Sequence, residues 1–269
     1  MFSLKILLSR WEILSWGNPQ LQNSGCHERY HFTEFLLLGM TDIQVLQPVL
    51  FVVFLAIYIV NVTGNGVIMM VVLSDSRLHS PMYFFLGNLS CLNICYSTVT
   101  LPKMLENFLS THKAISFLGC ISQLHFFHFV GSIEAMLLAV MGFDRFVAIC
   151  KPLRYTLIMN HQVCTQIAVT IWITGFSHSL LHSVMTSHSN FCGSNCIHHF
   201  FCDVKPLLEL ACGNTDLNEW LLHSVTGTIA ISPFSLTLLS YFFFLYHLLF
   251  RSVNQIILLN CEFEYSTRL

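Results

Sequence analysis

Residues 141–155 read MGFDRFVAICKPLRY, and they place an acid beside a base, Asp144 and Arg145, at the end of a long apolar run. The pair stands out because the 269-residue chain is 54% hydrophobic and only 10% charged. With a mean hydropathy of +0.65, this composition is typical of a membrane protein and not of a soluble domain. The formal net charge of −2 leaves no broad basic surface, so the composition indicates membrane lipid as a partner and excludes nucleic acid.

The apolar run before Asp144 is one of five runs that are long enough to cross a membrane. An α-helix needs about 20 mostly apolar residues to cross the hydrocarbon core, and a helix satisfies its own backbone polar groups in lipid. We therefore expect an all-α membrane protein with five transmembrane helices. The runs lie between Asp42 and Asp75, from 81 to 101 before Lys103, from about 114 to 142 around Glu134, from about 163 to 185, and between Glu219 and Arg251.

The basic residues predict the orientation of these spans. Three of them follow the third span within the 144–154 loop, whereas the longer 186–219 loop holds only Lys205. Because cytoplasmic loops carry an excess of Lys and Arg, we expect the 144–154 loop in the cytoplasm and the N-terminus outside. The expected organisation is an extracellular segment over 1–44, spans and loops over 45–250, and a cytoplasmic tail over 251–269.

The 186–219 loop is rich in cysteine, which suits disulfide bonds on an oxidising outer face. The stretch CGSNCIHHFFCD, 192–203, also offers enough Cys and His for zinc. Its spacing fits zinc poorly, because it has no C-x-x-C and its two histidines are adjacent and diverge. Disulfides are therefore the favoured interpretation, and zinc ligation and free thiols are the alternatives. Cys120, at the outer end of span three, is a natural partner for one of the loop cysteines. The loop cysteines are Cys192, Cys196, Cys202 and Cys212.

Four motifs occur together in order along the chain. They are Gly64-Asn65 in the first span, LHSPMYFFLGNLS (78–90) entering the second, the 141–155 stretch after the third, and Ser240-Tyr241 in the fifth. Over about Phe32 to Phe244, the sequence therefore resembles the olfactory receptors, which are rhodopsin-like G protein-coupled receptors with seven spans. The resemblance implies a rhodopsin-like helical bundle, five of whose seven helices are present, and detection of a small volatile odorant. We expect neither an enzyme nor a cofactor, since no catalytic or nucleotide motif stands out.

The resemblance also assigns a role to the acid and base of the opening stretch. In such receptors the Asp lies where the third helix meets the cytoplasm and holds the Arg at rest, and the Arg is offered to a heterotrimeric G protein on activation. Asp144 and Arg145 take these positions, and Phe146 replaces the usual Tyr, which removes one hydroxyl. A guanidinium at the membrane edge can reach water, and the adjacent carboxylate gives it a releasable partner.

The same resemblance pairs the outer cysteines. It implies a disulfide between Cys120 and Cys202, which ties span three to the outer loop, and a local one between Cys192 and Cys212. This assignment leaves Cys196 without a partner.

In this family, ligand recognition lies in the outer half of the bundle. The residues of span three that share one face there are mostly small or apolar, which suits a volatile ligand held by dispersion and one or two hydrogen bonds. Plain helix packing is the alternative for each of them. The candidate ligand-binding residues are Leu124, Phe127, His128, Gly131 and Ser132, with Val225 and Thr228 added from span five.

A carboxylate, Glu134, lies inside span three and has to be protonated, paired or hydrated there. In the family this acid can face an Asp from span two, but the corresponding position here is Asn93. Two interpretations stay open: a neutral Glu134 that is hydrogen-bonded to its neighbours, or a weakened sodium site formed by Glu134 and Asn93.

The chain departs from the family pattern at both ends. Residues 1–31 do not resemble a receptor N-terminus, and after about Tyr246 no counterpart of spans six and seven follows. We expect a plasma-membrane receptor by descent that is partly retained in the endoplasmic reticulum and whose signalling is impaired or lost, unless an intact receptor supplies the missing faces. The alternative function, a membrane transporter or channel subunit, is opposed by the lack of broken helices, of a second intramembrane charge and of repeat symmetry.

Overall fold

The computed structural model describes most of the central part of the chain. Predictions that fall on residues 1–27, on Cys192 or on residues 247–269 lie outside the described residues. The described residues are 28–29, 33–38, 45–78, 80–110, 113–191, 193–197, 199–229, 231, 234–243 and 245–246.

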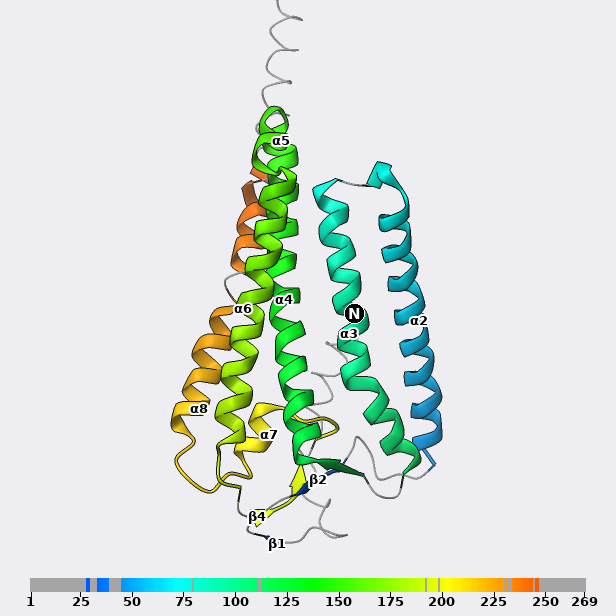
Figure 1. The fold of residues 1–269 in the computed structure, drawn as a ribbon, viewed down its shortest axis with the longest axis vertical. Helices are drawn as coiled ribbons and strands as arrows, with labels where there is room; N and C mark the ends of the chain where they lie inside the picture. Colours follow the sequence, from blue (N-terminus) through cyan, green and yellow to red (C-terminus); the bar gives the residue numbers. More distant parts are fainter. Residues whose placement is uncertain are drawn as a thin grey trace, which may run out of the picture.

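Long helices dominate the described residues (Figure 1). Five helical segments are long and apolar enough to cross a membrane, which confirms the prediction of an all-α membrane protein with five spans. The fifth segment, Asp216–Phe243, begins with α8 (Asp216–Leu221) and continues through a π-helical turn, η3 (Leu222–Thr226). The other four are α2 (Gln47–Ser74), α3 (Pro81–Leu109), α4 (Phe117–Cys150) and α6 (His161–Ser187).

Local sequence explains where these helices begin. Proline lies in the first turn of α2 and α3, where its missing N–H costs no hydrogen bond. Ser116 caps α4 by accepting from the Gly119 N–H, and Asn160 caps α6 by accepting from the Val163 N–H. Short turns join the helices: η1 (Ser76–Leu78), η2 (Pro152–Arg154) and α5 (Tyr155–Ile158).

Two helices extend beyond the ends predicted from the charge-free runs. Helix α3 passes through Lys103, whose Nζ donates to Glu106 Oε2 over 3.0 Å. Helix α4 runs to Cys150, so the prediction that Asp144 and Arg145 lie in a loop over 144–154 is wrong. A charge-free run marks the part of a helix that tolerates hydrocarbon, whereas the backbone hydrogen bonds of a helix continue into water. The predicted third run also began too early, because residues 114–116 form a strand.

The helices pack in sequence order, with α2 against α3, α3 against α4, and α4 against α6. In Figure 1, α8 lies beside α6 on the side away from α2. Gly175 makes the α4–α6 contact possible, because a Cβ at this position would lie 2.6 Å from Ile133 Cγ1. The absence of a side chain at Gly175 thus sets how closely the two helices approach.

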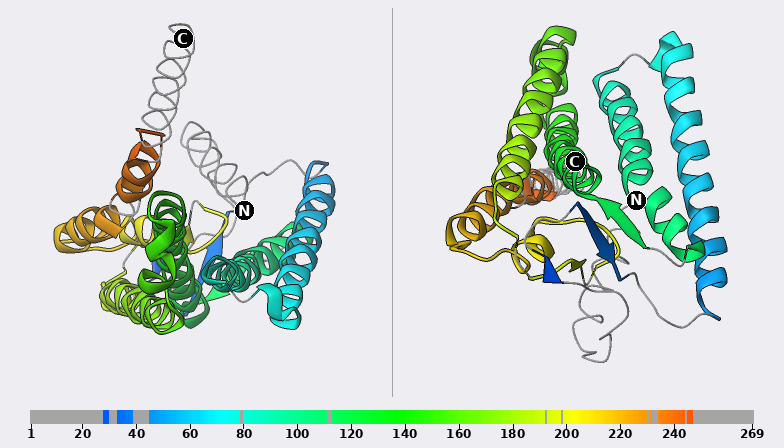
Figure 2. Two further views of the ribbon diagram at one scale, coloured as in Figure 1. Left: turned by 90° about the horizontal axis from the view of Figure 1, so that it is seen from above. Right: turned by 60° about the horizontal axis from the view of Figure 1, so that its bottom comes forward.

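Short strands cover one end of the bundle, which we call the outer end; they were not predicted. Strand β2 (Glu34–Leu37) lies between β3 (Ala114–Ser116), which is antiparallel to it, and β5 (Cys196–Ile197), which is parallel. Strand β1 (Glu28–Arg29) pairs antiparallel with β4 (Gly193–Ser194). The right-hand view of Figure 2 shows these strands beside the short helix α7 (Val204–Leu208). Strand pairing satisfies backbone groups that no helix satisfies there.

Candidate ligand and G protein sites

A disulfide bond fixes the outer loop to the start of α4. Cys120 and Cys202 are bonded, with their Cα atoms 5.3 Å apart, which confirms the pairing that the family resemblance implied. Cys196 and Cys212 each take part in a disulfide bond as well. The prediction that left Cys196 without a partner is therefore wrong. Since these three loop cysteines are held in disulfides, they cannot be the thiolate ligands of the alternative zinc site. The pairing of Cys192 stays a prediction.

Asp203, the residue after Cys202, places its carboxylate against His128 of α4. His128 Nε2 lies 3.0 Å from Asp203 Oδ1, and the Val204 N–H donates to the same oxygen over 2.7 Å. Burial by itself would raise the pKa of the Asp203 carboxyl, but the hydrogen bonds from His128 and Val204 outweigh burial and hold the pKa below its usual range. The charged form of Asp203 is therefore the one that the outer loop stabilises.

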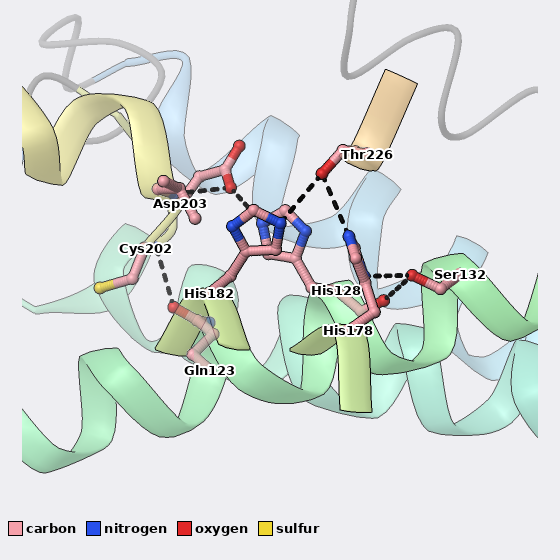
Figure 3. Close-up of polar contacts among 9 residues, drawn as sticks. Gln123, His128, Ser132, His178, His182, Cys202, Asp203 and Thr226 are labelled. Atoms are coloured by element: carbon pink, nitrogen blue, oxygen red, sulfur yellow. Dashed lines mark hydrogen bonds and ion pairs between the residues drawn. The ribbon is translucent and has the colours of Figure 1, made fainter. Parts of the chain in front are cut away.

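Two further histidines surround His128, and they come from one face of α6 (Figure 3). His178 and His182 are one turn apart, with ring centroids 4.7 Å from each other, and the His182 ring lies 5.4 Å from that of His128. Thr226 of η3 bridges them, because its Oγ1 lies 3.2 Å from His178 Nε2 and 3.3 Å from His182 Nε2. We call His128, His178, His182, Asp203, Thr226 and Ser132 the histidine network.

The direction of the hydrogen bonds in the network follows from the backbone carbonyl oxygen of His128, which can only accept. The Ser132 hydroxyl donates to the His128 carbonyl oxygen over 2.7 Å, so the Ser132 oxygen accepts from His178 Nδ1, 2.8 Å away. A neutral His178 then accepts at Nε2 from the Thr226 hydroxyl, and Thr226 in turn accepts from His182 Nε2. Because His128 Nε2 donates to Asp203, the Nδ1 atoms of His128 and His182 remain as acceptors, and neither has a hydrogen bond within the described residues.

The predicted ligand residues of α4 do not all take part in this network. His128 and Ser132 belong to it, whereas Leu124 is fully buried in the apolar cluster around Cys202. The Phe127 ring packs 4.7 Å from that of Phe201, and a Cβ at Gly131 would meet no atom within 4 Å. Leu124 and Phe127 are therefore packing positions and His128 and Ser132 are polar positions, whereas Gly131 is neither.

The fifth span contributes a residue that sequence analysis missed. Thr226 enters the network, whereas Thr228 is exposed and donates to the Ser224 carbonyl, and Val225 is half-buried. The π-helical turn η3 precedes Thr228 and changes which side chains share a face, so a count by 3.6 residues per turn selects the wrong positions. His178 and His182 were also missed, although their spacing of four in an apolar span was a usable signal.

At the other end of α4, the acid and base of the opening stretch are separated. Asp144 is buried and accepts a hydrogen bond from the Tyr155 hydroxyl over 2.9 Å, whereas Arg145 is exposed. Among the described residues, no ion pair joins Asp144 to Arg145, so the predicted contact between them is replaced by Tyr155. Burial, followed by the hydrogen bond to Asp144, raises the pKa of Tyr155 to about 12. The Phe146 ring lies 6.2 Å from that of Phe243, close to the end of the fifth span.

The candidate sodium site is only partly formed. Glu134 is buried, and the side-chain oxygen of Asn93 is buried without a hydrogen-bond partner among the described residues. Asn93 is held by its nitrogen, which donates to Asn65 Oδ1 over 3.0 Å. A carboxylate and a free amide oxygen are suitable ligands for a hard cation, but no group of three or more His, Cys, Asp or Glu in the described residues could hold a metal ion. The sodium site stays a prediction.

The bundle and its stapled outer loop define a multi-pass membrane protein with the architecture of a rhodopsin-like receptor. The family model described as olfactory receptor matches residues 54–258, past the point near Tyr246 where we expected the chain to leave the family pattern. The chain belongs to the olfactory receptor family.

Three human relatives show how much is shared. The chain is 78% identical to Olfactory receptor 12D1 over 220 residues, which cover 82% of this chain and 69% of that protein. It is 75% identical to Olfactory receptor 12D2 over 220 residues, 82% of this chain and 72% of the relative. It is 62% identical to Olfactory receptor 12D3 over 219 residues, 81% of this chain and 69% of the relative. Family membership makes the chain a receptor by descent.

Proposed function

We propose that this chain binds small volatile odorants at its outer end and that the ligand site includes the histidine network. The observation that carries the proposal is the convergence of polar side chains from α4, α6, η3 and the outer loop on one place in the bundle (Figure 3). A few converging polar groups among apolar ones are typical of small-molecule sites. Family membership supports an odorant as the ligand.

The free ring nitrogens of the network select the chemistry of the ligand. With a neutral network, the Nδ1 atoms of His128 and His182 can only accept a hydrogen bond. A ligand that donates one, such as an alcohol or a phenol, satisfies them, whereas an ether or a hydrocarbon does not. We therefore propose that hydroxyl-bearing odorants are preferred over their methyl ethers.

The proposal places the N-terminus and the stapled loop outside the cell, because disulfides form and persist in an oxidising environment. Arg145 then lies at the cytoplasmic end of α4, exposed and available to a heterotrimeric G protein, while Tyr155 holds Asp144. In the family, activation requires the sixth helix to move away from the third. We propose that the 269-residue polypeptide, expressed by itself, is partly retained in the endoplasmic reticulum and does not couple, unless an intact receptor supplies the missing faces.

A signalling experiment tests this function. The tagged 269-residue chain and a chimera that continues into spans six and seven of Olfactory receptor 12D1 would be expressed in cells that carry the olfactory G protein. Cyclic AMP and surface fraction would be measured across an odorant panel. We expect odorant-dependent signal from the chimera and none from the 269-residue chain. A chimera that reaches the surface and responds to no odorant would contradict the receptor function, and a robust signal from the shorter chain alone would contradict its proposed inability to couple.

A chimera with Arg145→Ala provides the control for coupling. This change is expected to abolish the cyclic AMP response while leaving the surface fraction unchanged, because Arg145 is exposed. The same response with and without Arg145 would remove the proposed G protein contact.

A further inference from the structure

A histidine outside the histidine network lies between α4 and α6, and its hydrogen bond has a defined direction. His125 Nδ1 of α4 lies 3.1 Å from the Oγ atom of Ser183 in α6. The Ser183 hydroxyl itself donates to the Ser179 carbonyl oxygen over 2.8 Å, so the Ser183 oxygen accepts from His125 Nδ1. A neutral imidazole carries one N–H, and Nδ1 uses it here. The other ring nitrogen, Nε2, can then only accept a hydrogen bond.

The Nε2 atom of His125 reaches the outside of the bundle. It has no hydrogen bond within the described residues, and the buried side-chain nitrogen and oxygen atoms that lack a partner there belong only to Asn93 and Asn107. The His125 ring is half-buried, and the neighbouring rings of Phe126 and Phe176 are exposed. Because hydrocarbon offers no water to an acceptor on such a surface, a membrane component with a donor gains a hydrogen bond there.

The depth of His125 in the membrane follows from its distance to Arg145 along α4. The two residues are 145 − 125 = 20 positions apart in one helix, which rises about 1.5 Å per residue, so they lie about 30 Å apart along its axis. The hydrocarbon core of a bilayer is also about 30 Å thick. With Arg145 at the cytoplasmic edge, an orientation that rests on the proposed function, His125 lies at the boundary between hydrocarbon and headgroups in the outer leaflet.

Aromatic rings continue the surface from His125 toward the membrane centre. Phe129, one turn further along α4, stacks on the His125 ring with centroids 6.2 Å apart and an interplanar angle of 13°. Phe176 of α6 lies 5.6 Å from the His125 ring and 6.1 Å from the Phe129 ring. We call His125, Phe129 and Phe176 the His125 surface. It is an apolar aromatic surface with a single acceptor at its outer edge.

We propose that the His125 surface binds a membrane sterol, whose hydroxyl donates to His125 Nε2 and whose fused rings lie against Phe129 and Phe176. A sterol has one hydroxyl at the headgroup boundary and a rigid apolar body below it. This arrangement matches one acceptor at the outer edge of an aromatic surface. Because fused rings are already rigid, they lose little conformational freedom on binding.

Phospholipids match the same surface less well. Phosphatidylcholine has no hydrogen-bond donor, and the ammonium of phosphatidylethanolamine lies in the headgroup layer, beyond the boundary at which Nε2 lies. Their acyl chains also lose rotamer freedom when they are ordered against a protein. The His125 surface shares no residue with the histidine network, so sterol binding is measured apart from odorant binding and coupling.

Photolabelling of the whole chain tests the proposal. The purified 269-residue protein in phosphatidylcholine nanodiscs would be irradiated with a sterol that carries a diazirine in its ring system and a free hydroxyl, and peptide mass spectrometry would locate the label. We expect label on α4 and α6 around Phe129 and Phe176. Cholesterol should displace the label about five-fold more potently than its methyl ether, as one net hydrogen bond of about 1 kcal/mol gives. Equal potency of the two, or stronger displacement by phosphatidylethanolamine than by cholesterol, would overturn the proposal.

A substitution gives an independent readout. His125→Phe keeps an aromatic ring on the surface and removes the acceptor, so cholesterol and its methyl ether should displace the label equally well. His161→Phe is the matched control, because His161 is an exposed histidine beside the Phe84 ring at the other end of α6, and this variant should keep the five-fold preference. Comparing two ligands within each variant cancels a loss of folded protein that affects both. A five-fold preference that survives His125→Phe would refute recognition of the hydroxyl by His125.

Discussion

The two ends of the helical bundle are built by different means. At the outer end, a disulfide between α4 and the loop, a three-stranded sheet and the histidine network join segments that are far apart in the sequence. At the opposite end, Asp144 accepts a hydrogen bond from Tyr155, eleven residues further along, while Arg145 and Leu153 are exposed, Leu153 to 99%.

This difference separates two tasks. A small ligand is recognised by groups held in fixed positions, and long-range bonds provide such positions at the outer end. A large partner can bind a surface of exposed side chains, which the opposite end offers. We therefore expect substitutions at the outer end to change folding and ligand binding, and substitutions at the other end to change coupling with small effects on stability.

The largest expected effect comes from removing the disulfide of the outer end. Cys120→Ser with Cys202→Ser opens a link between residues 82 apart in sequence and should lower the free energy of unfolding by about 4 kcal/mol in the loop-entropy model. Cell-surface labelling should show almost complete loss of surface protein. Cys150→Ser, which removes a free thiol near the other end of α4, is the control and should leave surface labelling unchanged. Equal surface labelling of both variants would contradict the expectation that substitutions at the outer end affect folding more than those at the opposite end.

The packing contact between α4 and α6 runs between the two ends of the bundle. It should be the feature next most sensitive to substitution. Gly175→Ala introduces a Cβ 2.6 Å from Ile133 Cγ1 and 3.4 Å from the Phe129 carbonyl oxygen, an overpacking that should cost about 3 kcal/mol. Tryptophan-detected thermal unfolding in detergent would measure the loss, and Ile133→Val should recover part of it. Gly66→Ala adds a Cβ that meets nothing within 4 Å, so it should be close to neutral.

Asp203→Asn should destabilise the outer end by about 2 kcal/mol, because hydrogen bonds to a charged group are lost or weakened. The folded-state pKa of Asp203 is lowered, so its contribution is present above the ordinary aspartate pKa of about 4 and is lost as the pH falls through the lowered value. The difference in unfolding temperature between wild type and variant should thus be full at pH 6 and shrink below about pH 4. A difference that grows on acidification would contradict the role given to the charged carboxylate.

Tyr155→Phe should have the smallest effect, about 1 kcal/mol, because it removes one hydrogen bond to Asp144. The pKa of Tyr155 is raised to about 12 in the folded protein, so its contribution is intact below the usual pKa of about 10 and is lost as the pH rises toward 12. Wild-type protein should therefore lose more stability between pH 9 and 12 than Tyr155→Phe does. Parallel alkaline unfolding curves for the two proteins would show that the hydrogen bond does not matter.

Much of the fold was predictable because a membrane imposes a simple length and polarity rule on each span. The five spans followed from charge-free runs, but their ends at Leu109 and Cys150 did not, since helices continue past the hydrocarbon. The Cys120–Cys202 bond came from the family resemblance. The bonded state of Cys196 was not predicted, because the family resemblance supplied no partner for it.

The candidate site was harder to predict than the spans. Single residues such as His128 and Ser132 were found from their shared helix face, whereas the network needs α6 and η3 to lie beside that face. The place of Thr226 depends on a π-helical turn, which no recognised sequence pattern predicted. Tyr155 was inside the opening stretch, but its contact with Asp144 requires the turn through η2 and α5.

Ligand binding to the purified chain tests the central claim most directly. The 269-residue protein in lipid nanodiscs would be titrated with a panel of hydroxyl odorants and their methyl ethers, with His182→Phe and, as a control, His125→Phe, whose ring nitrogen contacts Ser183 outside the network. We predict at least one pair in which the hydroxyl compound binds about 10-fold more tightly, as one hydrogen bond of about 1.4 kcal/mol would give. That preference should fall below about two-fold in His182→Phe and persist in His125→Phe. Equal affinity within every pair, or a preference that survives His182→Phe, would contradict a ligand site built on the histidine network.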